Sequence, residues 1–139
     1  MATIEDKIRM FRKEVNTGKL TSEQLAVYNI FTKSKGHPGH LSVADSQNRI
    51  VRLVVPIGRY SEGSGHILLK YYNEPVGRVT ASEILNMLKV IKQGRRTDDG
   101  HGHYDYRLKR KAGGVEYTLG VKITKKGDIL KSFYSDRRK

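Results

Sequence analysis

His66 and Lys70 have the residue types and the spacing that acid–base chemistry on a phosphate requires. His66 opens a predicted short helix at residues 66–72, directly after a loop rich in Gly and Ser. The free backbone N–H groups at a helix start favour a bound phosphate, and a histidine side chain titrates near neutral pH. Lys70 comes one helical turn later and shares a face with His66. We take both as candidate catalytic residues; a helix-capping histidine and a solvated lysine are the alternative interpretation.

The last third of the chain alternates polar and apolar residues in three stretches, 103–111, 115–123 and 129–134. Turn-forming residues separate the stretches, so the pattern predicts three antiparallel strands joined as a meander. Tyrosine and serine hydroxyls recur along them. The sequence therefore predicts a small basic sheet whose hydroxyl groups suit a phosphate-rich ligand.

Ser132 and Tyr134 are the candidate catalytic residues of the last strand. Strand alternation places them on one face and places Lys131 and Phe133 on the other. If Phe133 faces the helices, the two hydroxyls face the open side of the sheet. There they can donate to a phosphate oxygen or hold a ribose, and the tyrosine ring can stack on a base. Ordinary strand composition is the alternative, because tyrosine is common in sheets.

Basic and aromatic residues around these positions are candidates for binding the substrate. Arg95 and Arg96 follow the second predicted helix in a polar loop, and Arg107 and Lys109 share one face of the next strand by spacing. Tyr117 alternates with apolar residues on the middle strand, as Tyr134 does on the last. The complete set of predicted substrate-binding residues is Arg95, Arg96, Tyr106, Arg107, Lys109, Tyr117 and Lys131.

The sequence argues less strongly for a functional role of the remaining histidines. His103, and to a smaller degree His101, are alternatives for a second proton-transfer group, although loop histidines are usually plain surface residues. His37 and His40 lie beside Pro and Gly, and the sequence contains no cysteine. We therefore expect no metal site and no cofactor.

The chain of 139 residues has a formal net charge of +13, and the positive surplus is uneven. Residues 104–139 hold eleven of the 27 Lys and Arg but only four of the 14 Asp and Glu. Such clustering attracts polyanions, so we expect nucleic acid as the partner, ahead of an acidic membrane or an acidic protein. No stretch approaches the roughly 18 apolar residues of a membrane span. The N-terminus also lacks the apolar core of a signal peptide.

From residue 50 onward the predicted order of elements is strand, helix, helix and three strands. The first strand ends at Pro56, and a capping box at Thr80 and Glu83 opens the second helix. The order predicts an α+β fold in which a four-stranded antiparallel sheet packs against two helices and leaves its other face open. The predicted divisions are an N-terminal helical pair as an appendage (1–32), a linker or long loop (33–49) and the main domain (50–139), with its two helices at 66–72 and 81–93.

Two short motifs fit this element order. Gly65, His66 and Ile67 open the first helix of the main domain, and a serine precedes an aromatic residue in the closing strand, residues 130–134. In these features, roughly residues 50–136 resemble the barnase, EndoU, colicin and RelE (BECR) superfamily of metal-independent ribonucleases, in its phage-associated and polymorphic-toxin branches. Many of these proteins carry a second histidine or arginine shortly after the first, where this chain has Lys70 and Tyr71.

The resemblance implies an endoribonuclease that cleaves RNA, with tRNA among its candidate substrates, by attack of a 2′-hydroxyl on the adjacent phosphate. It also implies a cytoplasmic site of action for a protein that is borne by a phage or delivered into a target cell. A cognate immunity or antitoxin protein is the implied partner, and no membrane is involved. Two other classes stay open, a non-catalytic RNA- or DNA-binding module and a phage structural or packaging protein.

Overall fold

The computed structural model describes residues 2–110 and 114–138. In chain order these residues form α1 (Ile4–Glu14), the 3-10 turn η1 (Thr17–Lys19), α2 (Ser22–Phe31), β1 (Gly39–Ala44), β2 (Ile50–Val55), α3 (Gly63–Lys70), α4 (Ala81–Leu85), α5 (Leu88–Gln93), β3 (Arg95–Asp98), β4 (His103–Lys109), β5 (Glu116–Thr124) and β6 (Gly127–Ser135). The predicted α+β class is confirmed.

The described strands form one six-stranded sheet in the order β1-β2-β6-β5-β4-β3. β2 pairs with β6 in parallel, and every other neighbouring pair is antiparallel. The prediction of a four-stranded antiparallel sheet is therefore wrong, although β4, β5 and β6 do form the predicted meander. The parallel pair arises because the chain crosses from β2 over the helices before it returns as β6, and parallel neighbours need such a long crossover.

The two unpredicted strands lie in segments predicted as loops. β1 occupies part of the predicted linker, and its Leu41 and Val43 are buried against β2. Only these two apolar residues mark the strand, so the sequence pattern was too short to reveal it. β3 occupies part of the predicted polar loop, so Arg95 and Arg96 are strand residues paired with β4.

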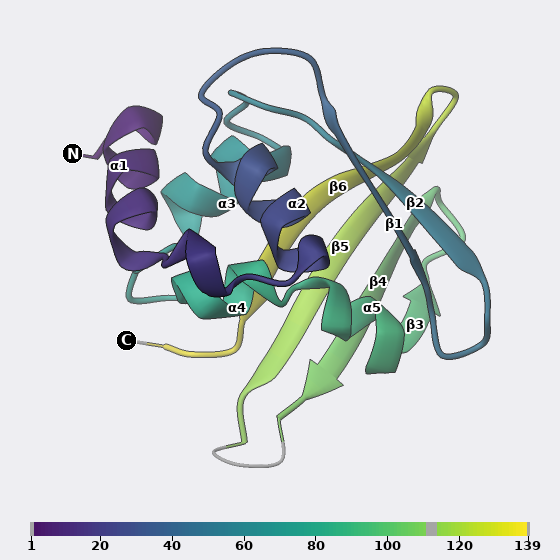
Figure 1. Ribbon diagram of the computed structural model, residues 1–139. Coiled ribbons are helices and arrows are strands. Elements are labelled where there is room, and N and C mark those ends of the chain that lie inside the picture. The colour runs from purple at the N-terminus through teal and green to yellow at the C-terminus, as the bar shows by residue number, and fades with distance from the viewer. Residues whose placement is uncertain (1, 111–113, 139) are drawn as a thin grey trace.

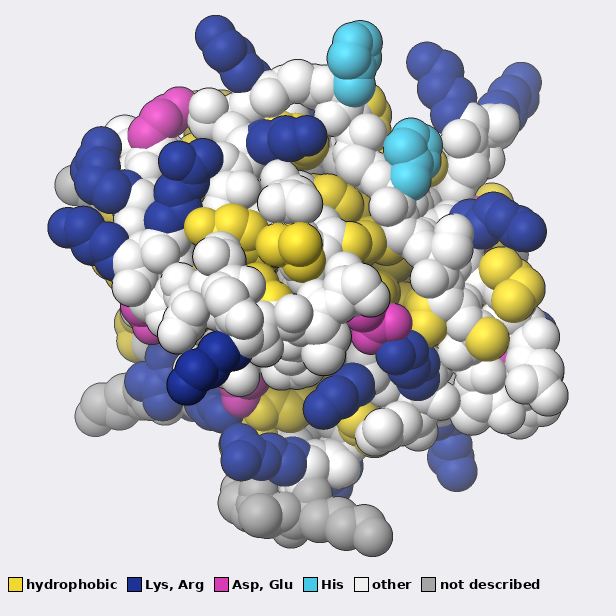
Figure 2. Space-filling view, in the orientation of Figure 1, with side chains coloured by type: hydrophobic (Ala, Val, Ile, Leu, Met, Phe, Trp, Pro, Cys, Tyr) yellow, Lys and Arg dark blue, Asp and Glu magenta, His cyan; other side chains and the backbone are white. Residues whose placement is uncertain are grey.

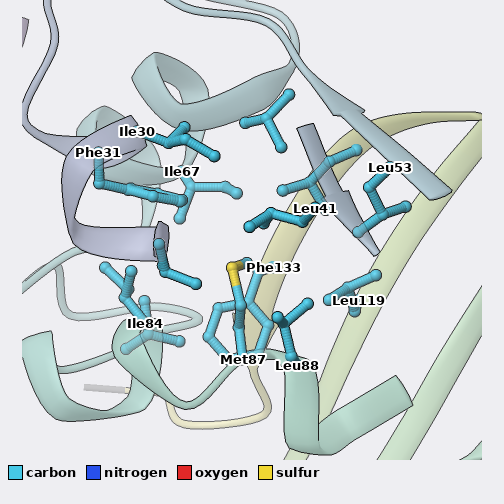
Figure 3. Packing of buried hydrophobic residues seen from close by; sticks show 14 of the residues in the cluster. Ile30, Phe31, Leu41, Leu53, Ile67, Ile84, Met87, Leu88, Leu119 and Phe133 are labelled. Carbon is cyan, nitrogen blue, oxygen red and sulfur yellow. The ribbon is translucent and has the colours of Figure 1, made fainter. Parts of the chain in front are cut away.

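The helices gather on one side of the sheet (Figure 1). α5 contacts β1, β4 and β5, α2 contacts β1, and α3 runs beside β6. Ile84, Met87 and Leu88 point towards Leu119 and Phe133 of the sheet (Figure 3), and all five side chains are buried in one hydrophobic cluster. This cluster fixes which side of each strand faces inward.

The N-terminal helices belong to the same hydrophobic cluster, so their description as an appendage needs correction. Phe11 of α1 is fully buried, with its ring 6.3 Å from the Phe31 ring and 5.6 Å from the Tyr72 ring. Lys7 is buried as well, and its ammonium donates to the Tyr72 carbonyl and to the Glu74 carboxylate. The apolar stripe of α1 thus packs against α3. The near-neutral charge of residues 1–32 gave no sign of this packing.

The helix predicted at residues 81–93 is divided into α4 and α5. The capping box is present as predicted, because the Thr80 hydroxyl accepts from the Glu83 backbone N–H and Glu83 accepts from the Thr80 backbone N–H. Asn86 ends α4, and its side-chain amide donates to the Ser82 carbonyl at 2.8 Å. A short polar side chain of this kind competes with helical hydrogen bonding, so the regular spacing of apolar residues did not guarantee one helix.

The sheet face opposite the cluster is called the open face below. On β4, Tyr104 and Tyr106 are buried in the cluster, so alternation points His103, Asp105 and Arg107 to the open face. Among the described residues, each helix that packs closely on the sheet contributes to the cluster side. None of the helices in the described part of the chain is long and apolar enough to cross a membrane.

Candidate active site at the edge of the open face

His66 lies inside α3 and is held by the loop that precedes the helix. α3 begins at Gly63 and ends at Lys70, three and two residues earlier than the predicted helix at 66–72. His66 is therefore its fourth residue, and the prediction that His66 opens the helix is wrong. The His66 Nδ1 atom lies 2.9 Å from the Tyr60 carbonyl oxygen. A carbonyl can only accept, so Nδ1 is the nitrogen that donates here, and in the neutral tautomer that does so Nε2 has the lone pair. This arrangement leaves Nε2 as the atom available to take a proton.

Tyr71 joins three of the predicted catalytic residues. Its ring meets the His66 ring edge-on with centroids 5.7 Å apart, and it lies 5.2 Å from the Tyr134 ring. The Lys70 ammonium lies 5.7 Å from the centre of the Tyr71 ring. Gly77 allows this packing, because a Cβ there would lie 2.7 Å from the Tyr71 ring. We call His66, Lys70, Tyr71 and Tyr134 the catalytic corner.

The hydroxyl of Tyr71 stays protonated over a wide pH range. Burial raises its pKa above the usual value of 10.0, and the nearby Tyr134 raises it further. Tyr71 is therefore a hydrogen-bond donor at neutral pH rather than a base. Its role was not predicted, because it lies in the irregular turn just after α3, where helical spacing no longer tells which side chains meet.

A cavity of about 530 Å³ adjoins the catalytic corner. Lys70, Tyr71 and Tyr134 line one part of it, and Val76 and Arg138 line another. Its size is within the range of cavities that hold small ligands, about 300–1,000 Å³. The catalytic corner therefore borders enough space for a nucleotide.

Ser132 and Tyr134 lie on the open face, as predicted. Ser132 pairs with Gly120 of β5, and a Cβ on Gly120 would approach the Ser132 hydroxyl to 3.0 Å. Lys131 was predicted to lie on the opposite face, but a β-bulge here changes the alternation. Lys131 is exposed and lines a hollow of about 170 Å³ with His103 and Asp105 of the open face. Within residues 2–110 and 114–138, no hydrogen bond joins Ser132 to the catalytic corner.

Two of the predicted substrate-binding tyrosines are buried on the helical side of the sheet. The Tyr106 hydroxyl donates to Asp45 at 2.7 Å, and Tyr117 stacks on Phe133 with centroids 6.1 Å apart. Tyr117 pairs with Ser135 in the register, so it faces the cluster and not the open side. Neither ring is available to stack on a base, and both predictions are corrected.

Asp45 explains why Tyr106 is structural. Burial by itself would raise the pKa of Asp45, but hydrogen bonds from the Tyr106 hydroxyl, from two backbone N–H groups and from Arg49 lower this pKa to about 2. The ionised carboxylate holds the turn between β1 and β2, because it accepts from the backbone of Gln47 and Arg49 at 2.9 Å each. Tyr106 thus anchors that turn to β4.

The predicted basic residues divide between the two faces. Arg107 and Lys109 of β4 and Arg95 of β3 point to the open face by register. Arg96 points the other way: its guanidinium lies 3.7 Å from the centre of the Tyr104 ring and is bonded to Asp98 at 2.8 Å. Arg96 is therefore engaged by the protein itself and is a weaker candidate for RNA.

Positive charge alone does not locate the site. Figure 2 shows Lys and Arg side chains spread over the face of the molecule that it presents, with few Asp or Glu between them. A basic surface of this extent favours polyanions generally. The combination that singles out one place is a cavity lined by Lys70, Tyr71 and Tyr134, with the His66 ring packed against Tyr71 outside that lining.

Comparison with known protein families, with characterised proteins and with solved structures finds no match to this chain. In residues 2–110 and 114–138, no group of three or more His, Cys, Asp or Glu side chains is arranged to hold a metal ion.

Proposed function

We propose that this protein is an endoribonuclease that cleaves RNA without a metal ion, by attack of a ribose 2′-hydroxyl on the adjacent phosphate. The observation that carries the proposal is the catalytic corner, in which His66, Tyr71 and Tyr134 form a continuous row of rings beside Lys70. The resemblance to BECR ribonucleases, with RNA such as tRNA as substrate and an immunity or antitoxin protein as partner, points the same way.

In the proposed reaction, the Nε2 atom of His66 takes the proton from the 2′-hydroxyl. The 2′-oxygen attacks phosphorus, the bond from phosphorus to the 5′-oxygen breaks, and a tyrosine hydroxyl of the catalytic corner protonates the leaving oxygen. The products are a 2′,3′-cyclic phosphate and a free 5′-hydroxyl. Lys70 stabilises the extra negative charge of the transition state, an effect that is often the largest single contribution to catalysis.

The chelator experiment separates this enzyme from a binding module. Purified protein is incubated with a labelled single-stranded RNA in excess EDTA, and the product ends are identified by mass spectrometry. The proposal expects cleavage that resists EDTA and leaves cyclic phosphate ends. RNA that is retarded in a gel but stays intact would instead support the non-catalytic binding module.

A matched pair of variants guards against a contaminating nuclease. His66→Asn should be purified in parallel with His37→Ala, which removes an exposed imidazole far along the chain from the catalytic corner. Cleavage that persists unchanged in both the His66→Asn and the His66→Ala preparations would show that the activity does not belong to the catalytic corner.

A further inference from the structure

The open face contains one straight row of residues that leads from the catalytic corner to two arginines. Tyr134 of β6 pairs with Thr118 of β5, Thr118 pairs with Arg107 of β4, and Arg107 pairs with Arg95 of β3. Residues paired across neighbouring strands point to the same side of a sheet. The four side chains therefore form a line perpendicular to the strands, which we call the arginine row.

We propose that single-stranded RNA crosses the sheet along the arginine row, so that Arg107 and Arg95 bind the backbone of nucleotides on one side of the scissile phosphate. This inference rests on the proposed function, because the catalytic corner defines where the scissile phosphate lies. It adds the direction of the substrate path and a dependence on substrate length.

The distances between the residues of the arginine row fit an RNA path that is longer than one nucleotide. Neighbouring strands are about 4.8 Å apart, so Arg107 lies about 10 Å from Tyr134 and Arg95 about 14 Å. A dinucleotide in the catalytic corner therefore ends before it can bring a second phosphate to Arg95. Only a substrate extended in the direction of β3 gains both contacts.

The neighbouring rows of the open face are less suited to a polyanion. The next row contains Asp105, paired with Gly120, which itself pairs with Ser132. The row beyond it contains Lys122, whose ammonium lies 4.0 Å from Glu62. An anionic backbone is therefore favoured along the arginine row over its neighbours.

Both arginines of the row are accessible. The Arg107 side chain is 54% exposed and lies 3.5 Å from Asp105, a distance that leaves most of its donors for a ligand. Arg95 is also exposed. The planar guanidinium group suits two-point hydrogen bonding to phosphate oxygens, so two such groups in line favour a phosphodiester backbone.

The test measures kcat/KM for a series of RNA oligonucleotides from a dinucleotide to a hexanucleotide, extended at either the 5′ or the 3′ end. Extension at one end only should raise kcat/KM of the unaltered protein. Arg107→Ala and Arg95→Ala should each lower kcat/KM by roughly tenfold on the extended substrate, the size expected for a lost hydrogen bond to a charged group. The loss should be much smaller on the dinucleotide, which has no phosphate beyond the scissile one.

Arg52→Ala is the matched control, because Arg52 is exposed on β2 and alternates to the open face near Gly127, at the other end of β6 from Tyr134. It removes the same charge without touching the arginine row. Equal losses in Arg52→Ala and Arg107→Ala, or losses that are as large on the dinucleotide as on the hexanucleotide, would overturn the proposed path.

The same proteins distinguish a failure of the path from a failure of the proposed function. Fluorescence anisotropy gives the affinity of each variant for a labelled hexanucleotide, whether or not it is cleaved. A protein that cleaves no RNA yet loses affinity only in Arg107→Ala and Arg95→Ala has the path but not the activity. If the affinity for the hexanucleotide is unchanged in both variants, the proposed path along the arginine row is overturned.

Discussion

At the scale of single residues, His66 offers the sharpest test of the chemistry. His66→Ala should lower RNA cleavage by about 10²–10⁴-fold, the usual contribution of general acid–base catalysis, while affinity for RNA changes little. The proposed mechanism assigns proton transfer to Nε2, because Nδ1 is already bonded to the Tyr60 carbonyl. Single-turnover cleavage and anisotropy on the same RNA provide the two measurements.

His66→Asn separates proton transfer from support of the loop. An asparagine amide can still donate to the Tyr60 carbonyl but cannot take a proton at neutral pH. We expect this variant to fold normally and to be as inactive as His66→Ala. If it retained the activity that His66→Ala loses, the imidazole would be a positioning residue, and the assignment of the base would move to His103.

The sequence pointed to some of these residues through local features and gave no signal for others, for physical reasons. His66 and Lys70 stood out because a histidine in a short helix after a glycine-rich loop is a local feature. Tyr71 was missed because its contacts depend on an irregular turn after α3. Lys131 was placed on the wrong face because a bulge shifts the alternation of β6, and single-sequence periodicity contains no sign of a bulge.

At the scale of elements, Glu83 ties three parts of the fold together. It caps α4, accepts from the Tyr117 hydroxyl of β5, and forms a two-point ion pair with Arg137 at 2.7 Å. Burial by itself would raise the pKa of Glu83, but the hydrogen bonds from Arg137, Tyr117 and Thr80 lower it from 4.5 to about 2. The stabilisation that follows is present above pH 4.5 and is lost as the pH falls through 2.

Glu83→Gln should therefore lower the free energy of unfolding at pH 7 by up to about 3 kcal/mol, since one pKa unit corresponds to about 1.4 kcal/mol. Glutamine can keep the helix cap but leaves Arg137 without its charge partner. The variant should also lose less stability than the unaltered protein between pH 5 and pH 2. Urea unfolding across this pH range measures both effects. Equal pH dependence in the two proteins would contradict the assignment, and Glu5→Gln is an exposed control.

Element prediction succeeded where a local signal was complete. The capping box predicted at Thr80 and Glu83 is present, since it satisfies backbone groups only three residues apart. The prediction of elements failed where contacts between distant segments determine whether a strand forms and how it pairs. β1 has only two buried apolar residues and becomes a strand because β2 pairs with it, and the parallel pairing of β2 with β6 depends on a crossover that no local pattern records.

At the scale of the whole molecule, the two faces of the sheet differ in what they contact: one packs against the helices, and the other is the open face. The hydrophobic cluster takes side chains from α1 through β6, including the N-terminal pair, so the described residues share one core. Along β3 and β4 the open face is left with charged residues such as Arg95, Asp105 and Arg107. A net charge of +13 is costly to a compact chain through self-repulsion, which a bound polyanion relieves.

The affinity for RNA should therefore depend steeply on salt. Each neutralised phosphate of a single strand contributes about −0.7 to the slope of log affinity against log salt concentration, because bound counterions are released. If Lys70, Arg107 and Arg95 each neutralise one phosphate, the slope should be about −2. Arg107→Ala should reduce it in magnitude by about 0.7, whereas His66→Asn should leave it unchanged because that exchange removes no phosphate-binding cation. A salt series by fluorescence anisotropy on a hexanucleotide measures these slopes. A flat dependence would remove phosphate binding as the basis of both the catalytic corner and the arginine row.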